Sequence, residues 1–313
     1  MTMKKLDDGI SARMGQAMRM PAKPFVKWAG GKSKLLSDIR SKYPAGLGNE
    51  IKKYAEPFAG GGAVLFDILS SYRMDEIYIS DINRELIHAY IAIRDNVIEL
   101  AASLRVLEES YTGADGGARK EIYKSARRRY NELKTNGGGT AEAASLFIFL
   151  NKTCYNGLYR VNSRGAFNVP QGNYIKPKIC DERNLHAVSE KLQKVSIVCA
   201  GYKESRQFID SKTFAYFDPP YRPLSATANF TSYGEDSFGD NEQAELAAFI
   251  GEMAKKGARI AASNSDPKNT DAGDFFFDRL YAGYNISTIY ASRSINSVGT
   301  SRGAVSELLI TNY

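Results

Sequence analysis

EPFAGGGAVLF, residues 56–66, is the stretch that decides the fold. Its first residues are typical of a strand end, its three glycines of a tight turn, and its apolar residues of a helix start. A short β-rich run at 76–80 follows and ends at Asp81. Strand, glycine turn, helix and strand with a terminal acid predict a βαβ unit, and such units build parallel sheets covered by helices on both faces.

Further elements extend this unit. A turn and short helix are expected at 24–39, and strand-like runs lie at 195–200, 213–217, 259–263 and 304–310. Residues 86–150 have helical spacing instead, as with Ile122, Ala126, Tyr130 and Leu133, and residues 151–177 are rich in Gly, Asn and aromatic residues, as a loop or hairpin would be. We predict an α/β fold, a Rossmann-like doubly wound sheet with an inserted, mainly helical plus hairpin domain.

This pattern divides the chain into three parts. Residues 1–23, with five methionines among small and charged residues, are expected to form a flexible extension. Residues 24–85 and 191–313 are expected to form the catalytic domain, and residues 86–190 the inserted domain.

Positive charge is concentrated in the middle of the chain. The formal net charge is +7, yet residues 119–178 contain twelve Lys or Arg and three Glu, so the rest of the chain is slightly acidic. Such a patch suits a polyanion such as nucleic acid, although a solvated helix face is an equal alternative for its helical part.

Cysteine and apolar content exclude several classes. The three cysteines are widely spaced without a C-x-x-C pair, and the chain has two histidines, so we expect no metal site and no disulfide framework. A reducing cytoplasm fits this usage. The longest apolar runs, such as 144–150, are too short to span a membrane, so no membrane partner is expected.

The glycine turn predicts an adenosine-containing ligand. Asp81 lies 21 residues after Gly60, where an acid in a βαβ unit can bind ribose hydroxyls. The sixth position counted from Gly60 is Leu65, which departs from the nicotinamide-binding pattern, and Val26 stands where a Walker A loop ending at Lys32 needs glycine. A purely structural glycine turn is the alternative.

Asp218-Pro219-Pro220-Tyr221 follows the strand-like run 213–217 directly. The acid and a carbonyl freed from regular pairing can both accept hydrogen bonds from an NH2 group, and the tyrosine ring can stack on a flat base. This is a device for holding a flat amine. A strand that ends in a proline turn with a surface tyrosine is the structural alternative.

Taken in order, these motifs resemble those of Dam-type DNA adenine-N6 methyltransferases. The resemblance covers nearly the whole chain, and its order is that of the α-class amino-methyltransferases. Further stretches resemble the GATC-methylating members, residues 151–160 with 167–170, and 223–231. Residues 293–296 with Arg302 resemble a C-terminal family element.

The resemblance implies S-adenosylmethionine as cofactor. The implied cofactor-binding residues are Trp28, Lys32, Phe58, Gly60, Gly62, Asp81 and Asp218. The implied catalytic residues are Asp218, Pro219, Pro220 and Tyr221, where Asp218 and the Pro219 carbonyl accept the two N6 hydrogens of adenine and Tyr221 stacks on the base.

The resemblance also implies double-stranded DNA as partner, with the target adenine flipped out of the duplex. Tyr155 would fill the gap with Asn156 beside the orphaned partner, and Arg160 would read a guanine. Leu158 and Pro170 would contact a thymine methyl, and Lys27 and Tyr174 the first guanine of the site. For Leu158 a hairpin-core role is an equal alternative, and for Arg160 a phosphate contact is the second choice.

Two other functions compete with this one. An N4-cytosine methyltransferase could use the same amine clamp, but Asp218, where a serine would favour cytosine, and the motif at 25–32 argue for adenine. A DNA-binding module without catalysis is the other alternative, against which the intact Asp218 and glycine turn argue. No cysteine follows a proline, which disfavours cytosine-C5 chemistry. A monomer is expected, although the sequence does not determine the oligomeric state.

Overall fold

The fold is built on one seven-stranded sheet with the order β3-β2-β1-β4-β5-β7-β6. The computed structural model describes residues 21–222, 238–291 and 305–313. β1 to β5 pair in parallel, whereas β7 runs antiparallel to both β5 and β6. The strands are β1 (Lys53–Glu56), β2 (Glu76–Asp81), β3 (Val195–Cys199), β4 (Thr213–Phe217), β5 (Arg259–Ser265), β6 (Asn285–Ala291) and β7 (Val305–Thr311).

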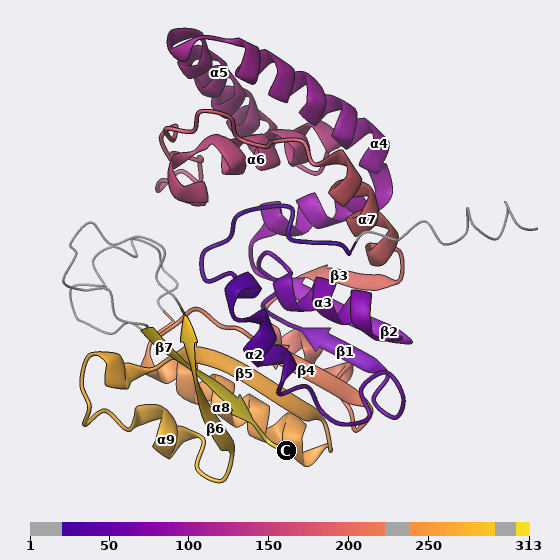
Figure 1. The fold of residues 1–313 in the computed structure, drawn as a ribbon, viewed down its shortest axis with the longest axis vertical. Coiled ribbons are helices and arrows are strands. Elements are labelled where there is room, and N and C mark those ends of the chain that lie inside the picture. Colours follow the sequence, from indigo (N-terminus) through magenta and orange to yellow (C-terminus); the bar gives the residue numbers. More distant parts are fainter. Residues whose placement is uncertain (1–20, 223–237, 292–304) are drawn as a thin grey trace, which may run out of the picture.

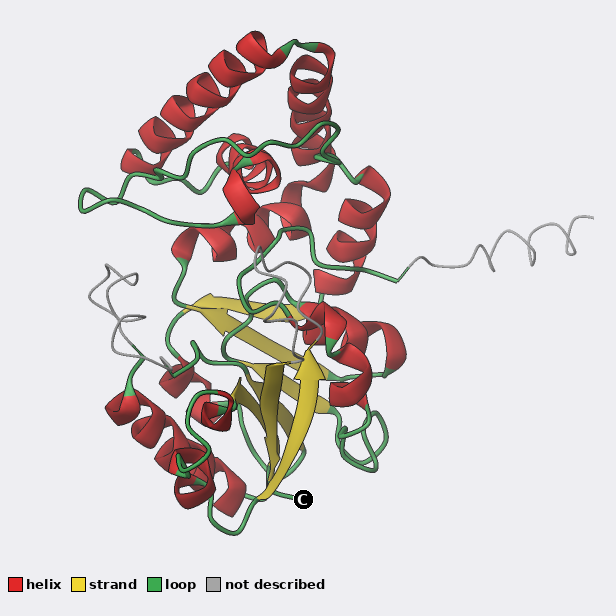
Figure 2. Ribbon diagram, turned by 60° about the vertical axis from the view of Figure 1, so that its left-hand side comes forward, coloured by secondary structure: helices red, strands yellow, loops and turns green. Residues whose placement is uncertain are grey.

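Helices lie on both faces of the sheet, as Figure 2 shows. In β4, which is buried along its whole length, Phe214 and Tyr216 join one hydrophobic cluster and Ala215 and Phe217 join the other. Successive side chains of a strand point to opposite faces, so a strand between two helical layers must be apolar throughout. The continuous apolar run 213–217 follows from this position.

The helices fall into two groups along the chain. The α-helices are α2 (Leu36–Arg40), α3 (Ala63–Ser71), α4 (Arg84–Gly113), α5 (Gly116–Thr135), α6 (Ala141–Thr153), α7 (Glu182–Leu192), α8 (Asp240–Lys255) and α9 (Phe276–Leu280). Short 3₁₀ turns are η1 (Lys32–Lys34), η2 (Tyr155–Gly157), η3 (Tyr202–Gln207) and η5 (Pro267–Asn269). In Figure 1, α4, α5 and α6 gather at one end of the molecule, beyond the sheet.

The βαβ unit predicted from residues 56–81 is confirmed. β1 ends at Glu56, α3 begins at Ala63, and β2 ends at Asp81 beside β1 in parallel register. Gly62 has a left-handed φ of 74°, and a Cβ there would lie 2.4 Å from the Tyr90 hydroxyl oxygen. Glycine is therefore required both by the backbone conformation and by the space available.

The predicted strands at 195–200, 213–217 and 259–263 are confirmed with small changes at their ends, and β7 covers most of the closing run. β6 was not predicted from the sequence, and neither was the antiparallel direction of β7. Both depend on pairings between distant segments, which local periodicity does not encode.

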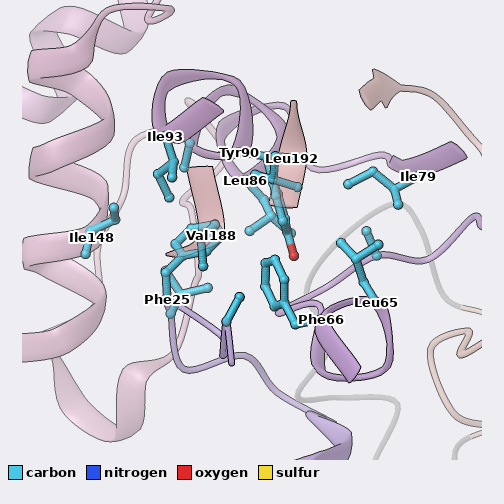
Figure 3. Close-up of a cluster of buried hydrophobic side chains, with 14 of the residues drawn as sticks. Phe25, Leu65, Phe66, Ile79, Leu86, Tyr90, Ile93, Ile148, Val188 and Leu192 are labelled. Carbon is cyan, nitrogen blue, oxygen red and sulfur yellow. The ribbon is translucent and has the colours of Figure 1, made fainter. Parts of the chain in front are cut away.

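Helices α4 to α7 and the sheet share one hydrophobic core. We call residues 21–28 the N-terminal segment. Figure 3 shows its Phe25 turned toward Phe66 from α3, Tyr90 and Ile93 from α4, and Val188 from α7. The rings of Phe25 and Tyr90 meet edge to face with centroids 4.8 Å apart. This packing fixes the N-terminal segment between the helices and the βαβ unit.

Some expectations fall outside the described residues. They are the extension up to residue 20, the run 223–231, the element at 293–296 and Arg302. Of the residues predicted to end the extension, Lys23 donates its N–H to the Asn184 side chain and accepts a hydrogen bond from it, both at 2.9 Å. Within the described ranges, no helix combines the length and apolar character needed to cross a membrane.

Candidate active site

Four acidic or polar residues meet at one edge of the sheet. Glu56 ends β1, Asp218 follows β4, and Ser265 ends β5. Because β7 is antiparallel, its first residues lie at this same edge, and Glu307 pairs with Ser265 in the β5–β7 register. Ligands of open α/β sheets bind at the carboxyl ends of the parallel strands, so this edge is the candidate site.

Lys32 provides the positive charge of the site. Its side chain is 3% exposed, and its ammonium donates a 2.6 Å hydrogen bond to the Gly30 carbonyl. The same Nζ lies 2.7 Å from Asp218 Oδ1 and 4.0 Å from Glu307 Oε2. A buried ammonium needs such partners, and here two carboxylates from distant segments supply them.

Asp218 is held ready to accept hydrogen bonds. Burial raises the pKa of its carboxyl to about 6, the Lys32 ammonium limits that rise, and the charge of Glu307 adds to it. Asp218 Oδ1 pairs with the Lys32 ammonium at 2.7 Å, and within the described residues no donor contacts Oδ2. The side chain is therefore ionised at neutral pH with unused acceptor capacity.

Two contacts fix the side chain of Tyr221, one at its hydroxyl and one over its ring. Its hydroxyl donates to Glu307 Oε2, and the Lys32 ammonium lies 4.7 Å from the centre of its ring. Burial raises the pKa of the Tyr221 phenol well above its usual value, and the negative charges of Asp218 and Glu307 act in the same direction. The phenol stays protonated, and the ring has a defined orientation beside Asp218.

Glu56 lies beneath this cluster and is buried. Its Oε2 accepts a 2.6 Å hydrogen bond from the Tyr54 hydroxyl. Burial raises the pKa of Glu56 to about 8, an effect that the Tyr54 bond opposes and the nearby Asp218 charge reinforces. At neutral pH, Glu56 is thus mostly protonated, and the charged groups around Lys32 are Asp218 and Glu307.

Three hydrogen bonds hold the glycine turn after β1 and the Asp81 carboxylate beside it. The Gly60 N–H donates to Asp81 Oδ2 at 3.0 Å, and the Asn83 N–H donates to Asp81 Oδ1 at 2.8 Å. The Tyr90 hydroxyl donates to the Gly60 carbonyl at 3.0 Å. Burial raises the pKa of Asp81, and the two N–H groups oppose this. A carboxylate has about four lone-pair sites, so Asp81 can still accept a hydroxyl.

The two aromatic residues predicted beside this turn pack on different sides. The Trp28 indole lies next to Gly60, where a Cβ would come within 3.0 Å of it, and it stacks on Tyr159 with centroids 6.0 Å apart. Phe58 stacks on Tyr202 at 5.6 Å and meets Phe238 edge to face. The structure thus places Trp28 against one of the two hydrophobic clusters and Phe58 against the other.

The segment after α6 folds back on itself as a loose hairpin without regular strands. Isolated antiparallel bridges join Cys154 to Gln171 and Val161 to Phe167, and the Tyr155 N–H donates to the Pro170 carbonyl at 2.9 Å. The side chain of Tyr155 is 55% exposed and that of Leu158 42% exposed. We call residues 154–171 the hairpin.

Other predicted DNA contacts lie on or beside the hairpin. Asn156 has a left-handed φ of 53° and Pro170 is exposed. The Arg160 Nε donates to Asn168 Oδ1 at 2.8 Å, which extends the exposed guanidinium along the hairpin. The Lys27 ammonium lies 3.9 Å from the centre of the Tyr174 ring, a cation–π contact that joins the N-terminal segment to the chain after the hairpin.

Asn151 ties the hairpin to the N-terminal segment. Its buried side chain accepts the Lys27 N–H at 2.7 Å and donates to the Lys27 carbonyl at 2.8 Å and the Gly157 carbonyl at 2.9 Å. Because Trp28 follows Lys27 directly, this one amide links the hairpin to the glycine turn of the site. The sequence analysis did not single out Asn151.

Glu307 was likewise not predicted from the sequence as a residue of the site. The residue lies inside the predicted closing strand, and it reaches the site because β7 is antiparallel and begins at the active edge. An acid near the start of that strand was the available signal, but it becomes informative only when the strand direction is known.

Comparisons with known proteins identify the family of the chain. The family model for D12 class N6 adenine-specific DNA methyltransferases matches residues 28–295. The chain is 46% identical to the type II methyltransferase M.MjaIII of Methanocaldococcus jannaschii, over 94% of this chain and 100% of that protein. It is 35% identical to the DNA adenine methylases of Vibrio cholerae and Escherichia coli, over 91% of this chain and 94% and 93% of theirs. The chain therefore belongs to the D12 class of N6 adenine-specific DNA methyltransferases.

Proposed function

We propose that this adenine-N6 DNA methyltransferase uses S-adenosylmethionine and acts on an adenine flipped out of the sequence GATC. The observation that carries the chemistry is the Asp218 carboxylate, which lies directly after β4, where Oδ1 contacts the Lys32 ammonium at 2.7 Å and Oδ2 accepts no hydrogen bond within the described residues. A carboxylate with spare acceptor capacity at the ligand-binding edge suits an incoming NH2 group.

The charges of the site support the choice of cofactor. Bound S-adenosylmethionine would supply an electrophilic methyl group on a positively charged sulfonium. Two carboxylates, Asp218 and Glu307, face the single ammonium of Lys32, which leaves an excess of negative charge suited to a cation. The Gly60 turn, braced by Asp81, would hold the nucleoside part, with Asp81 on the ribose and Trp28, Phe58 and Gly62 beside it.

Asp218 and the Pro219 carbonyl would activate the amine. The lone pair of adenine N6 is delocalised into the ring, so the nitrogen is a poor nucleophile. Hydrogen bonds from its two hydrogens to Asp218 and to the Pro219 carbonyl favour a pyramidal nitrogen with an available lone pair. The Asp218 carboxylate also stabilises the positive charge that develops on N6 during in-line transfer.

Tyr221 would hold the base in plane. Its ring, fixed by Glu307 and Lys32, offers a flat face for stacking on the flipped adenine. Pro220 completes the turn that follows Asp218. Removing the base from the duplex costs roughly a few kcal/mol, and stacking on Tyr221 offsets part of this cost.

The hairpin would read the DNA. Exposed Tyr155 would enter the gap left by the flipped base, with Asn156 near the orphaned partner. Arg160 would contact a guanine edge, and Lys27 with Tyr174 the first guanine. Leu158 and Pro170 would contact a thymine methyl. These pairings of side chain and base are those that major-groove chemistry favours.

We therefore divide the chain into residues 24–85 and 191–313 as the catalytic domain and residues 86–190 as the target-recognition domain. One chain carries both the candidate pocket and the candidate recognition surface, so we propose that a monomer is sufficient for transfer. The DNA substrate and the three free cysteines support a cytoplasmic location.

Methyl transfer to defined DNA tests this function. Tritiated S-adenosylmethionine is incubated with unmethylated duplexes that differ only in the adenine of GATC, and the labelled base is identified after hydrolysis. We expect N6-methyladenine and protection of GATC sites from a methylation-sensitive nuclease.

Transfer without GATC protection would overturn the sequence preference but not the chemistry. Label in N4-methylcytosine would contradict both the family match and the proposed base, and the absence of transfer with retained DNA binding would indicate a binding module. Sequencing the methylated positions in treated genomic DNA then gives the site directly.

A further inference from the structure

The two prolines after Asp218 create a structural problem. Proline has no backbone N–H, so this turn cannot be held by donors of its own at positions 219 and 220. At these two positions the backbone can form hydrogen bonds only through its carbonyl oxygens, as acceptors. The described residues offer the Pro219 carbonyl no hydrogen bond, whereas the Pro220 carbonyl accepts one of 3.0 Å from Gln243 Nε2.

Gln243 belongs to a buried pair of amides. It lies in the first turn of α8 and is 0% exposed, and its Oε1 accepts a 2.9 Å hydrogen bond from Asn264 Nδ2. Asn264, on β5, is 3% exposed and accepts the N–H groups of Ser265 at 3.0 Å and Arg222 at 3.4 Å. The amide pair thus contacts the backbone at residues 220 and 222, on both sides of Tyr221.

The direction of this chain of hydrogen bonds is fixed at both ends. A backbone carbonyl can only accept, so the Gln243 amide must donate to Pro220. Backbone N–H groups can only donate, so the Asn264 carbonyl oxygen must face Ser265 and Arg222. Neither amide can be turned over without leaving buried polar atoms unpaired, and the arrangement is therefore rigid.

We propose that Gln243 and Asn264 are positioning residues for methyl transfer. By occupying the Pro220 carbonyl and anchoring Arg222, they hold the turn so that the Pro219 carbonyl stays free for the target amine and Tyr221 stays over the base. The backbone pairing of β4 with β5 ends at Phe217 and Ala262, so these two side chains continue the connection where the ladder stops. The inference rests on the proposed roles of Asp218, Pro219 and Tyr221.

Gln243→Met tests the proposal because it keeps the side-chain length and removes both hydrogen bonds. We expect single-turnover transfer, at saturating DNA and cofactor, to fall about 10- to 100-fold, as small misplacements of reacting groups do. Dissociation constants for S-adenosylmethionine and DNA should change less than about threefold, since the turn is misplaced rather than lost. Leu246→Met, a buried change one turn further along α8, controls for packing and should leave the rate near that of the wild type.

Gln243→Asn retains a buried amide around which the protein can fold, but it is one methylene too short to bridge Pro220 and Asn264. Its rate should lie between those of the wild type and Gln243→Met. Combining Gln243→Met with Asn264→Leu should cost little more than either change alone, because both break the same chain.

A rate for both Gln243 variants within about twofold of the wild type, or a loss matched by Leu246→Met, would overturn the proposal. Asp218→Ala, assayed in parallel, separates the two levels of inference. If it retains transfer, the proposed function of the turn is wrong; if it abolishes transfer while Gln243→Met is normal, only the positioning role fails.

Discussion

The candidate pocket and the hairpin differ in how their functional side chains are satisfied. In the candidate active site, Lys32 is buried, Asp218, Tyr221 and Glu307 are partly buried, and the four contact one another. On the hairpin, the side chains of Tyr155 and Leu158 are exposed and contact solvent. The chemical part of the site is thus organised without a ligand, whereas the hairpin side chains that we propose to read DNA would gain their contacts from it.

The chemistry and the proposed DNA reading can therefore be altered separately by substitution. A buried cluster must satisfy its own polar groups, so each residue of the pocket depends on the others. Exposed hairpin side chains depend less on contacts with their neighbours, so they can be substituted one at a time. Changes in the pocket should therefore affect rate or stability, and changes on the hairpin should affect the choice of sequence.

Asp218→Ala gives the sharpest test of this separation. We expect transfer to fall at least about 10³-fold, because the main acceptor for the amine is lost, while DNA binding measured by gel shift remains. A comparable loss of binding would show that Asp218 has a structural role and that the two regions are not independent. In the wild type, the transfer rate should fall as the pH is lowered through about 6, where Asp218 takes up a proton.

Glu56→Gln tests whether Glu56 is protonated next to the charged residues of the site. The raised pKa of Glu56, about 8, means that the folded protein binds a proton that the unfolded chain has lost above pH 4.5. Stability should therefore decrease as the pH rises toward 8, and the glutamine variant should lose this dependence. Through Glu56, the unfolding free energy of the wild type should decrease by about 2 kcal/mol between pH 6 and pH 8.

Urea unfolding at several pH values measures the effect of Glu56→Gln. Glu85→Gln is the control, because Glu85 lies 2.7 Å from Lys134 and this contact lowers the pKa of Glu85 against the effect of burial. Its contribution to stability is lost only as the pH falls below about 4.5, so between pH 6 and 8 Glu85→Gln should keep the slope of the wild type. Equal slopes for the wild type and Glu56→Gln would contradict a protonated Glu56 beneath Asp218.

Arg160→Ala tests the hairpin side of the comparison. Loss of a guanine contact should reduce discrimination at that base by about 1 to 3 kcal/mol and leave the maximal transfer rate nearly unchanged. Competition between duplexes that differ at single positions measures this. Arg164→Ala, which removes the same charge from the exposed turn of the hairpin, is the matched control. A uniform loss over all duplexes would instead identify a phosphate contact.

Leu158→Ala should have the smallest effect. Because the side chain is 42% exposed, we expect unfolding free energy to change by less than about 1 kcal/mol, with a modest loss of preference for the thymine-containing site. Thermal unfolding and the same competition assay measure both quantities. A large loss of stability without altered preference would assign Leu158 to the hairpin core.

Much of the fold was accessible from local sequence. Local sequence patterns predicted the glycine turn with its flanking strands and the strand at 213–217. The structure contains these elements at the predicted positions. β6 and the reversed β7 were missed because partner and direction depend on segments far apart in the chain. Asp218 and Tyr221 could be proposed from one motif, but Glu307 could not, because the structure brings it to them through sheet topology alone.

The supports of the site were also hidden from sequence reading. Asn151, Gln243 and Asn264 are ordinary polar residues within a helix or strand, and nothing in their spacing marks them. Their importance appears only when their backbone partners are known. Roles for the hairpin residues came from resemblance and stay predictions until DNA is bound.

The N-terminal segment has a consequence for exchanging recognition domains between related enzymes. Asn184 brackets the backbone of Lys23 and Asn151 brackets that of Lys27, each by accepting its N–H and donating to its carbonyl. These amides come from α7 and α6, yet the backbone they bind leads into Trp28 and the pocket. A chimera that transplants α4 to α7 should therefore work when the donor keeps both asparagines, and its junctions are set by these contacts rather than by the ends of the helices.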